Sequence, residues 1–260
     1  SETAGMVAGQ DARWLFVMKN AVIGQMRHLM PAVAAAMRWS DSGNVTALPP
    51  NFQFMRTTKV EQLGPVFLRA TLQGEDVSAY GTKSIHFRLV QPSLAAETEW
   101  PTVAPNGSIK WTDGPGAPHK PVYTVRSVDY DAGEIITDIF LHDCCKTTDW
   151  AAEIKEGCKA RNVIGLVGPM GGGLMDAKRT LMACDETGFP AAARILENLP
   201  EDATGELYLE AENGAECAYP IELPKGMGVT WLSRAKGDRL LDAVLERYKD
   251  FSDAPIWFAG

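Results

Sequence analysis

The feature that most constrains the fold is a change of pattern along the chain. From Phe52 to about His142, short β-like runs alternate with turn residues, which is typical of a small antiparallel barrel. From about Thr148 onward, apolar β-like runs alternate with helical segments, which indicates a parallel sheet of nucleotide-binding type. We therefore expect a β-barrel plus α/β architecture: a helical extension and linker over 1–50, a barrel domain over 51–147, and an α/β domain over 148–260.

The expected barrel strands follow from alternation and turn chemistry. Between Val66 and Gln73, polar and apolar residues alternate, as on a strand with one buried face. Asp129–Gly133 provides a hairpin turn before the last strand. The expected strands are Phe52–Val60, Val66–Gln73, Ser84–Val90, Val122–Val128 and Glu134–Leu141, with a Pro/Gly-rich loop over Pro92–Pro121.

The α/β half contains continuous apolar runs. Asn162–Val167 predicts a fully buried parallel strand, which Gly168–Pro169 ends. Thr148–Asp149 and Asp185–Thr187 precede helical segments and are expected to cap them. The other expected strands are Thr180–Cys184, Glu206–Ala211, Val229–Leu232 and Ile256–Ala259, and the expected helices are Trp150–Glu156, Pro190–Leu199 and Asp238–Lys249.

Charge and cysteine content exclude several classes of protein. The net charge of −8 over 260 residues argues against a nucleic-acid partner and against general attraction to anionic membranes. The five cysteines form no regular framework, which points to a reducing compartment and a cytoplasmic location. Cys144, Cys145 and Cys158 lack a fourth cysteine at the spacing of an iron–sulfur site, so we expect no metal centre.

The N-terminal region is apolar but interrupted by charges. Residues 13–39 contain no apolar run near the roughly 18 residues that span a bilayer. We expect an amphipathic helix that packs on the body or serves an oligomer contact, with a linker over 40–51. No integral membrane segment is expected, and the chain is predicted to be a monomer or a weak oligomer.

The candidate site residues gather at the ends of two predicted strands. Tyr123, Thr124 and Arg126 combine a ring, a hydroxyl and a guanidinium, and His142 ends the strand that follows. A flat, phosphate-bearing cofactor needs these groups: the ring covers a face, the hydroxyl bonds an edge nitrogen, and the cation meets a phosphate. The alternatives are a surface Tyr/Thr pair, a solvated strand arginine and a structural histidine.

Two further places suit a nucleotide. Thr147 and Thr148, with the backbone N–H groups of the helix that follows, can bind a pyrophosphate at the positive end of the helix dipole. The glycine run that begins at Gly168 and the Asp185–Thr187 turn are each expected at the carboxyl edge of a parallel sheet, where ligands bind. A flexible turn and plain helix capping are the alternatives.

Several motifs in order give a family resemblance over Phe52–Gly260. The segments that carry it are Val122–Arg126, Asp138–His142, Thr148–Ala151, Gly165–Gly171, Asp185–Ala191, Trp231–Arg234 and Trp257–Gly260. With these segments the chain resembles the siderophore-interacting protein family, the ferric-siderophore reductases, which are ferredoxin-reductase-like flavoproteins. It departs from the family's flavin motif, Arg-x-Tyr-Thr-x-Arg, at Pro121, and from Gly-Pro-Ala after the histidine at Asp143–Thr147.

The resemblance implies that the barrel binds FAD and that the α/β domain binds NADH or NADPH. Hydride then passes to flavin N5, single electrons pass to a ferric siderophore, and iron(II) is released, with no catalytic acid, base or nucleophile. The implied cofactor-binding residues are Tyr123, Thr124, Val125, Arg126, Ile139, Leu141, His142, Thr147, Thr148, Gly168, Asp185, Glu186 and Thr187. Candidate contacts to the siderophore are Lys83, Arg88, Arg126 and Arg234.

Two other functions stay open at this point. One is a different NAD(P)H-flavin oxidoreductase of the same architecture, with a flavin, quinone or protein acceptor. The other is a non-catalytic siderophore-binding relative that has lost its flavin. The departures from the family motifs at Pro121 and Cys144–Cys145 are the reason to test this alternative.

Overall fold

The computed structural model describes residues 48–260, apart from 82, 144 and 158–160. The expected N-terminal helix, most of its linker, Cys144 and Cys158 lie outside the described residues. The chain divides into two compact units, of which the larger holds Pro50–Pro92 and Pro118–Gly260. In the smaller unit, the Pro/Gly-rich loop contains a short antiparallel hairpin formed by β4 (Thr102–Val103) and β5 (Ile109–Lys110).

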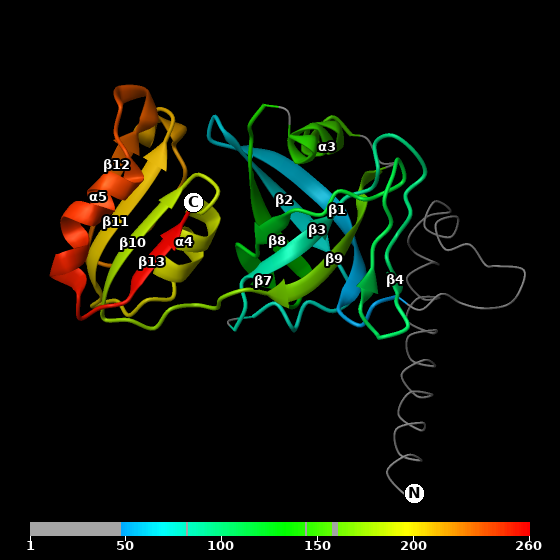
Figure 1. Ribbon diagram of the computed structural model, residues 1–260, viewed down its shortest axis with the longest axis horizontal. Helices are drawn as coiled ribbons and strands as arrows, with labels where there is room; N and C mark the ends of the chain where they lie inside the picture. Colours follow the sequence, from blue (N-terminus) through cyan, green and yellow to red (C-terminus); the bar gives the residue numbers. More distant parts are fainter. Residues whose placement is uncertain (1–47, 82, 144, 158–160) are drawn as a thin grey trace, which may run out of the picture. The chain divides into compact units, whose positions relative to one another are not determined.

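The first part of the larger unit is an antiparallel seven-stranded sheet with the order β6-β3-β9-β1-β2-β8-β7 (Figure 1). Apolar side chains from alternate positions of these strands, among them Leu72, Leu89 and Ile135, fill one core. The strands are β1 (Phe52–Leu63), β2 (Phe67–Gln73), β3 (His86–Val90), β6 (Val122–Thr124), β7 (Ser127–Asp129), β8 (Glu134–Phe140) and β9 (Val163–Met170).

The predicted strand Val122–Val128 is two strands at opposite ends of the sheet order. β6 pairs with β3 and β7 pairs with β8, and only Val125 and Arg126 separate them in the chain. The Arg126 N–H donates to the carbonyl of Ile136, and the Thr137 hydroxyl donates to the carbonyl of Thr124. The chain from β6 to β7 therefore joins the two edges of the sheet and closes it into a barrel. This confirms the predicted antiparallel β-barrel.

The strand predicted over Asn162–Val167 is placed wrongly by the sequence analysis. β9 pairs antiparallel with β1 and with β3, so it belongs to the barrel and not to the parallel sheet. Its apolar residues Ile164 and Leu166 lie in the barrel core. Helix α3 (Lys146–Lys155) also packs on the barrel through Trp150 and Ala151. The domain division at residue 148 stays a prediction.

The second part of the larger unit is a four-stranded parallel sheet with the order β12-β11-β10-β13, and it confirms the predicted α/β class. Its strands are β10 (Arg179–Asp185), β11 (Thr204–Ala211), β12 (Gly226–Ser233) and β13 (Ile256–Ala259). The helices are α4 (Phe189–Leu196), α5 (Leu240–Arg247) and the short helices η2 (Gly214–Cys217), η3 (Arg234–Lys236) and η4 (Tyr248–Phe251).

Helices α4 and α5 cover opposite faces of this sheet. Met182 and Cys184 of β10 pack with α4, whereas Leu181 and Ala183 pack with Leu240 of α5. Successive side chains of a strand point to opposite faces, so the two helices lie on different sides (Figure 1). The carboxyl edge of the sheet, where β10 meets α4, is left for the site.

The predicted helix caps are wrong in detail. Cys145 is the N-cap of α3 and Gly188 is the N-cap of α4, and neither helix has a side-chain capping hydrogen bond. Thr148 and Asp149 therefore lie in the first turn of α3 rather than before it. Over residues 48–260, with the gaps given above, no helix has the length and apolar character needed to cross a bilayer.

Candidate functional site

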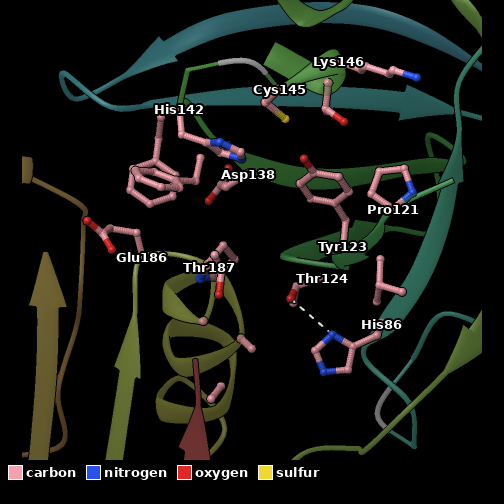
Figure 2. Close-up of a pocket in the computed structure, with 18 of the residues that line it drawn as sticks. His86, Pro121, Tyr123, Thr124, Asp138, His142, Cys145, Lys146, Glu186 and Thr187 are labelled. Atoms are coloured by element: carbon pink, nitrogen blue, oxygen red, sulfur yellow. Dashed lines mark hydrogen bonds between the residues drawn. The ribbon is translucent and has the colours of Figure 1, made fainter. Parts of the chain in front are cut away.

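A cavity of about 780 Å³ is lined by residues of the barrel, of α3 and of the parallel sheet (Figure 2). Its volume lies within the usual range for small-molecule and cofactor sites. The lining residues from the barrel and α3 are Phe67, His86, His119, Pro121, Val122, Tyr123, Thr124, Asp138, Phe140, His142, Cys145, Lys146 and Thr147. Those from the parallel-sheet part are Glu186, Thr187, Gly188, Pro190, Ala191, Trp257, Phe258 and Ala259.

Tyr123 projects from β6 with its ring and hydroxyl directed toward α3 (Figure 2). Burial raises the pKa of its phenol to about 12, so the side chain is neutral throughout the physiological range. The ring offers a flat apolar face and its hydroxyl one polar group, a combination suited to covering an aromatic ligand.

Thr124, the next residue of β6, is buried and its hydroxyl lies 3.3 Å from Nδ1 of His86 (Figure 2). The two residues are directly paired in the β3–β6 register. His86 is half-buried, and its pKa is lowered by burial and by the nearby charge of Arg194. A neutral imidazole therefore stands beside the threonine hydroxyl at neutral pH.

The N-terminus of α3 opens on the cavity. Cys145, Lys146 and Thr147 line the cavity, and the first turn lacks a side-chain cap, so its N–H groups are available to an anion. Thr147 is buried and its hydroxyl donates to Oε1 of Gln91, while the Thr148 hydroxyl lies 3.4 Å from the carbonyl of His142. Lys146 adds a positive charge at the same helix end.

The opposite wall comes from the turn between β10 and α4. Thr187 donates through its N–H and its hydroxyl to Oδ1 of Asp185, which fixes a compact turn. Position 188 has no room for a side chain, because a Cβ there would lie 2.6 Å from the Cβ of Cys184. The backbone of this turn is thus drawn close to the sheet edge, beside Trp257 and Ala259.

Glu186 is 4% exposed and is held by charge. Arg234 at the end of β12 donates to both of its carboxylate oxygens and also to Glu210, and the Glu212 N–H donates to Oε1 of Glu186. These carboxylates raise the pKa of Arg234. Because its guanidinium is bonded to these carboxylates, Arg234 holds Glu186 in the cavity wall but does not itself line the cavity.

Six predicted cofactor residues come together in the cavity: Tyr123, Thr124, His142, Thr147, Glu186 and Thr187. Val125 and Ile139 are buried in the barrel core, and Leu141 packs beside that core. Within the described chain, Thr148, Asp185 and Gly168 are also absent from the lining. Gly168 lies in β9, so the parallel-sheet edge that motivated its selection is not where it is found.

The four predicted substrate cations lie elsewhere than on the cavity wall that the structure describes. Arg126 forms an ion pair with Glu197 after α4, and its side chain is 12% exposed. Arg88 donates to the carbonyl of Lys120 at 3.1 Å, and Lys83 is an exposed turn residue. Their proposed contact with a siderophore stays a prediction.

Sequence reasoning missed His86, His119, Lys146 and the Trp257–Ala259 strand as lining residues. The strand carried a signal, because parallel strands present their carboxyl ends at one edge. Lys146 also carried one, since it stands at the start of the predicted helix dipole. A lone histidine in a strand, such as His86, carries none until its cross-strand partner is known.

The donor set of this cavity fits FAD. A tyrosine ring and a buried threonine hydroxyl suit the flavin ring system, and a helix N-terminus with Lys146 suits the pyrophosphate. Pro121 occupies the place of the family's first arginine on the cavity wall, and Lys146 brings a cation to the same cavity. The cavity wall therefore carries a cationic side chain although that arginine is missing.

A closed antiparallel barrel followed by a parallel sheet defines the ferredoxin-reductase-like class of flavoproteins. A solved ferredoxin reductase of carbazole 1,9a-dioxygenase shares this fold at a TM-score of 0.54 and 14% identity, with coverage of 83% of this chain and 61% of that one. Residues 56–173 match the siderophore-interacting FAD-binding domain, and residues 177–260 match the siderophore-interacting protein model. The chain belongs to the siderophore-interacting protein family, and its barrel part is the family's FAD-binding domain.

Among curated proteins, the NADPH-dependent ferric-chelate reductase of Escherichia coli is 28% identical over 80% of this chain and 82% of its own. The ferric vibriobactin reductase ViuB of Vibrio cholerae is 29% identical to this chain. The matched region covers 64% of this chain and 61% of ViuB. A solved siderophore utilization protein from T. fusca superposes at a TM-score of 0.61 with 24% identity, covering 82% of each chain.

Proposed function

We propose that this protein is a flavin reductase that uses FAD to pass electrons from NADPH or NADH to a ferric siderophore. One observation carries the proposal. A single cavity joins Tyr123 and Thr124 of the FAD-binding barrel to Thr187 and Trp257 at the carboxyl edge of the parallel sheet. A flavin on the first wall and a nicotinamide on the second would share one cavity and lie close together, as electron transfer between them requires.

The chain's own residues would bind and orient the cofactor. The Tyr123 ring covers one face of the flavin, the Thr124 hydroxyl bonds its polar edge, and the first turn of α3 with Lys146 holds the pyrophosphate. When bound, FAD accepts a pair of electrons from the nicotinamide nucleotide and releases them singly to iron. Positioning and exclusion of water are the protein's contribution.

The nicotinamide nucleotide would bind at the turn between β10 and α4. This turn lies at the carboxyl end of a central parallel strand, where such sheets bind their ligands. Gly188 allows a close backbone approach, and Thr187 is exposed to the cavity. The E. coli relative is named for NADPH, which supports NADPH as a donor without distinguishing it here from NADH.

The ferric siderophore is proposed as the electron acceptor because two relatives are named as ferric-chelate and ferric vibriobactin reductases. Reduction frees the metal, since hard oxygen ligands bind iron(II) far less tightly than iron(III). Among the described residues, the basic groups that line the cavity are Lys146 and three histidines, His86, His119 and His142. We propose a cytoplasmic location, in keeping with the irregular cysteine pattern.

The visible spectrum of the purified full chain tests the proposal. The protein should bind added FAD, its flavin bands should bleach under nitrogen with NADPH or NADH, and they should return when ferric tris(catecholate) or ferric tris(acetohydroxamate) is added. Bands that bleach but fail to return with either chelate would point to a different acceptor. A protein that rejects FAD would be a non-catalytic relative, and the proposed function would be wrong.

A further inference from the structure

His86 has no role in the proposed binding of FAD, yet it contacts the residue expected at the flavin's polar edge. Its Nδ1 lies 3.3 Å from the Thr124 hydroxyl, and its other ring nitrogen, Nε2, points away from Thr124 (Figure 2). The ring lines the cavity and is half-buried. One nitrogen therefore faces the threonine while the other belongs to a ring that water can still reach.

The surrounding strands hold this ring in one place. His86 pairs with Thr124 on β6 and with Met170 on β9. Gly171 follows β9 with φ of +74°, and a Cβ there would lie 2.8 Å from Cδ2 of His86. The glycine run that sequence analysis assigned to a nucleotide thus makes room for the imidazole at Gly171.

Burial and a nearby charge favour the neutral form of His86. Burial lowers its pKa, and the charge of Arg194 on α4 lowers it further. A hydrogen bond with the backbone of Tyr123 on β6 acts in the opposite direction. Gly171 contributes no ionisable group. A neutral imidazole whose Nδ1 carries no proton can accept one from a hydroxyl, and this tautomer places the ring proton on Nε2.

The stoichiometry of the proposed reaction creates a proton that must leave. A reduced nicotinamide nucleotide delivers two electrons together with one proton, whereas each ferric ion takes one electron and no proton. One full cycle therefore converts one reduced nucleotide and two ferric ions into the oxidised nucleotide, two ferrous ions and one proton. The proton is released beside the flavin, in the cavity that Thr124 and His86 both line.

We propose that His86 removes this proton through the Thr124 hydroxyl, a role that rests on the proposed function. As electrons leave for iron, the Thr124 oxygen takes the proton from the cofactor and gives its own hydroxyl proton to Nδ1 of His86. The imidazole becomes an imidazolium and releases the proton on Nε2 to water, which leaves a neutral ring with its proton on Nδ1. Exchange of ring protons with water then returns the proton to Nε2 and leaves Nδ1 free to accept in the next cycle. Charge and atoms balance, and Thr124 ends each cycle unchanged.

Two carboxylates of the cavity wall, Asp138 and Glu186, are already engaged. Asp138 accepts hydrogen bonds from Arg69 and Tyr219. Glu186 is paired with Arg234. Among the described cavity residues, the hydrogen bond to the Thr124 hydroxyl is made by His86. The route through Thr124 therefore ends at this imidazole.

Two substitutions separate proton transfer from positioning. In His86→Asn, an amide takes the place of Nδ1 and can still bond Thr124, but it cannot carry a proton between pH 5 and 8. In His86→Ala, both functions are lost. The full chain is loaded with FAD, reduced anaerobically by NADPH, and mixed with ferric tris(acetohydroxamate) in a stopped-flow instrument across that pH range.

We expect flavin reoxidation to slow about 100-fold in both variants, the low end of what a positioned proton acceptor contributes. In the wild type, reoxidation should slow as pH falls and His86 becomes protonated, with a solvent deuterium isotope effect, and both signatures should vanish in His86→Asn. Reduction by NADPH, in which no proton leaves, is the internal reference. If His86→Asn were reoxidised as fast as the wild type while His86→Ala stayed slow, His86 would only position Thr124, and the proposal would be overturned.

A second readout needs no turnover. The chain has four histidines, so nitrogen NMR of the full chain can assign His86 by comparison with His86→Asn. At pH 7 we expect a neutral ring with an unprotonated Nδ1 whose resonance shifts in Thr124→Val. A protonated Nδ1 would overturn the relay. Wild-type protein that holds FAD but is never reoxidised by ferric chelates would instead refute the proposed function.

Discussion

The Tyr219 hydroxyl donates a hydrogen bond to Oδ2 of Asp138 at 2.6 Å, and it joins two parts of the chain that are distant in sequence. Asp138 lies in β8 of the barrel, and Tyr219 follows β11 of the parallel sheet. The Asp138 carboxylate is fully buried and accepts two further bonds from Arg69, at 2.7 and 2.8 Å. Buried charge is tolerated only with such partners, so the barrel depends on this tyrosine to complete them.

Replacing Tyr219 with phenylalanine should lower the free energy of unfolding by about 2 kcal/mol, the usual value of a hydrogen bond to a charged group. The ring packs against Phe67 and Phe189 at centroid distances of 4.6 and 5.7 Å, and phenylalanine keeps those contacts. Urea unfolding of the FAD-free protein measures the change.

Tyr208→Phe is the matched control for this prediction. Its hydroxyl also donates to a carboxylate, Glu206, but that side chain is 29% exposed and keeps its pairing with Arg247. We expect a smaller loss, about 0.5–1 kcal/mol. Equal losses in the free energy of unfolding would show that the buried hydrogen bond to Asp138 stabilises the protein no more than the more exposed one to Glu206.

The fold could be predicted from the sequence wherever the pattern was local. Alternation along β2, the turn before β8 and the apolar runs of β10 and β11 all depend on neighbouring residues. β9 could not be placed in this way. An apolar run buried on both sides looks the same in a barrel and in a parallel sheet, and its partners, β1 and β3, lie far away in the chain.

Site residues could be predicted where they belong to a local motif. They could not be predicted where their position depends on a partner that is distant in the sequence. Tyr123 and Thr124 belong to a recognisable motif and line the cavity. Arg126 stands in the same motif, but Glu197, 71 residues away, takes its guanidinium. No local pattern reports such a pairing, and the same limit hid the contact between His86 and Thr124.

Lys146 should contribute to FAD binding and Arg126 should not. Lys146 lines the cavity at the N-terminus of α3, so Lys146→Gln should weaken FAD binding by roughly 3- to 10-fold, and the loss should shrink at high salt. Arg126→Gln removes a cation that pairs with Glu197 and should leave FAD affinity within roughly 2-fold. Titration of the FAD-free variants, followed by flavin fluorescence, measures both. The reverse ranking would return the phosphate contact to Arg126, as first expected from the motif.

Two cavity histidines should make the folded protein less stable in acid. The pKa of His86 is lowered by burial and by Arg194, and that of His119 by burial and by Lys146 and Lys120. Because the unfolded chain, with a histidine pKa near about 6.5, binds these protons more readily, stability is complete above that pH and falls as pH drops below it.

Unfolding of the FAD-free protein by urea between about pH 7.5 and 5.5 tests this effect. His86→Asn and His119→Asn should each lose less stability over that interval than the wild type, and the double variant least of all. Wild-type and variant curves that run parallel would show that neither imidazole is neutral because of its surroundings.

Cys145 should report the position of the cofactor directly. Among the described cysteines, Cys145 lines the cavity as the N-cap of α3, whereas Cys184 and Cys217 are buried and burial raises the pKa of both thiols. Iodoacetamide attacks the thiolate, so Cys184 and Cys217 should react slowly in the folded protein.

FAD bound at the α3 N-terminus would cover Cys145 and slow its alkylation several-fold, as mapped by peptide mass spectrometry. NADPH added without FAD should protect it far less, because the proposed nucleotide turn at Thr187 lies on the opposite wall. Alkylation of Cys145 at an unchanged rate in the FAD-loaded protein would place the pyrophosphate away from α3.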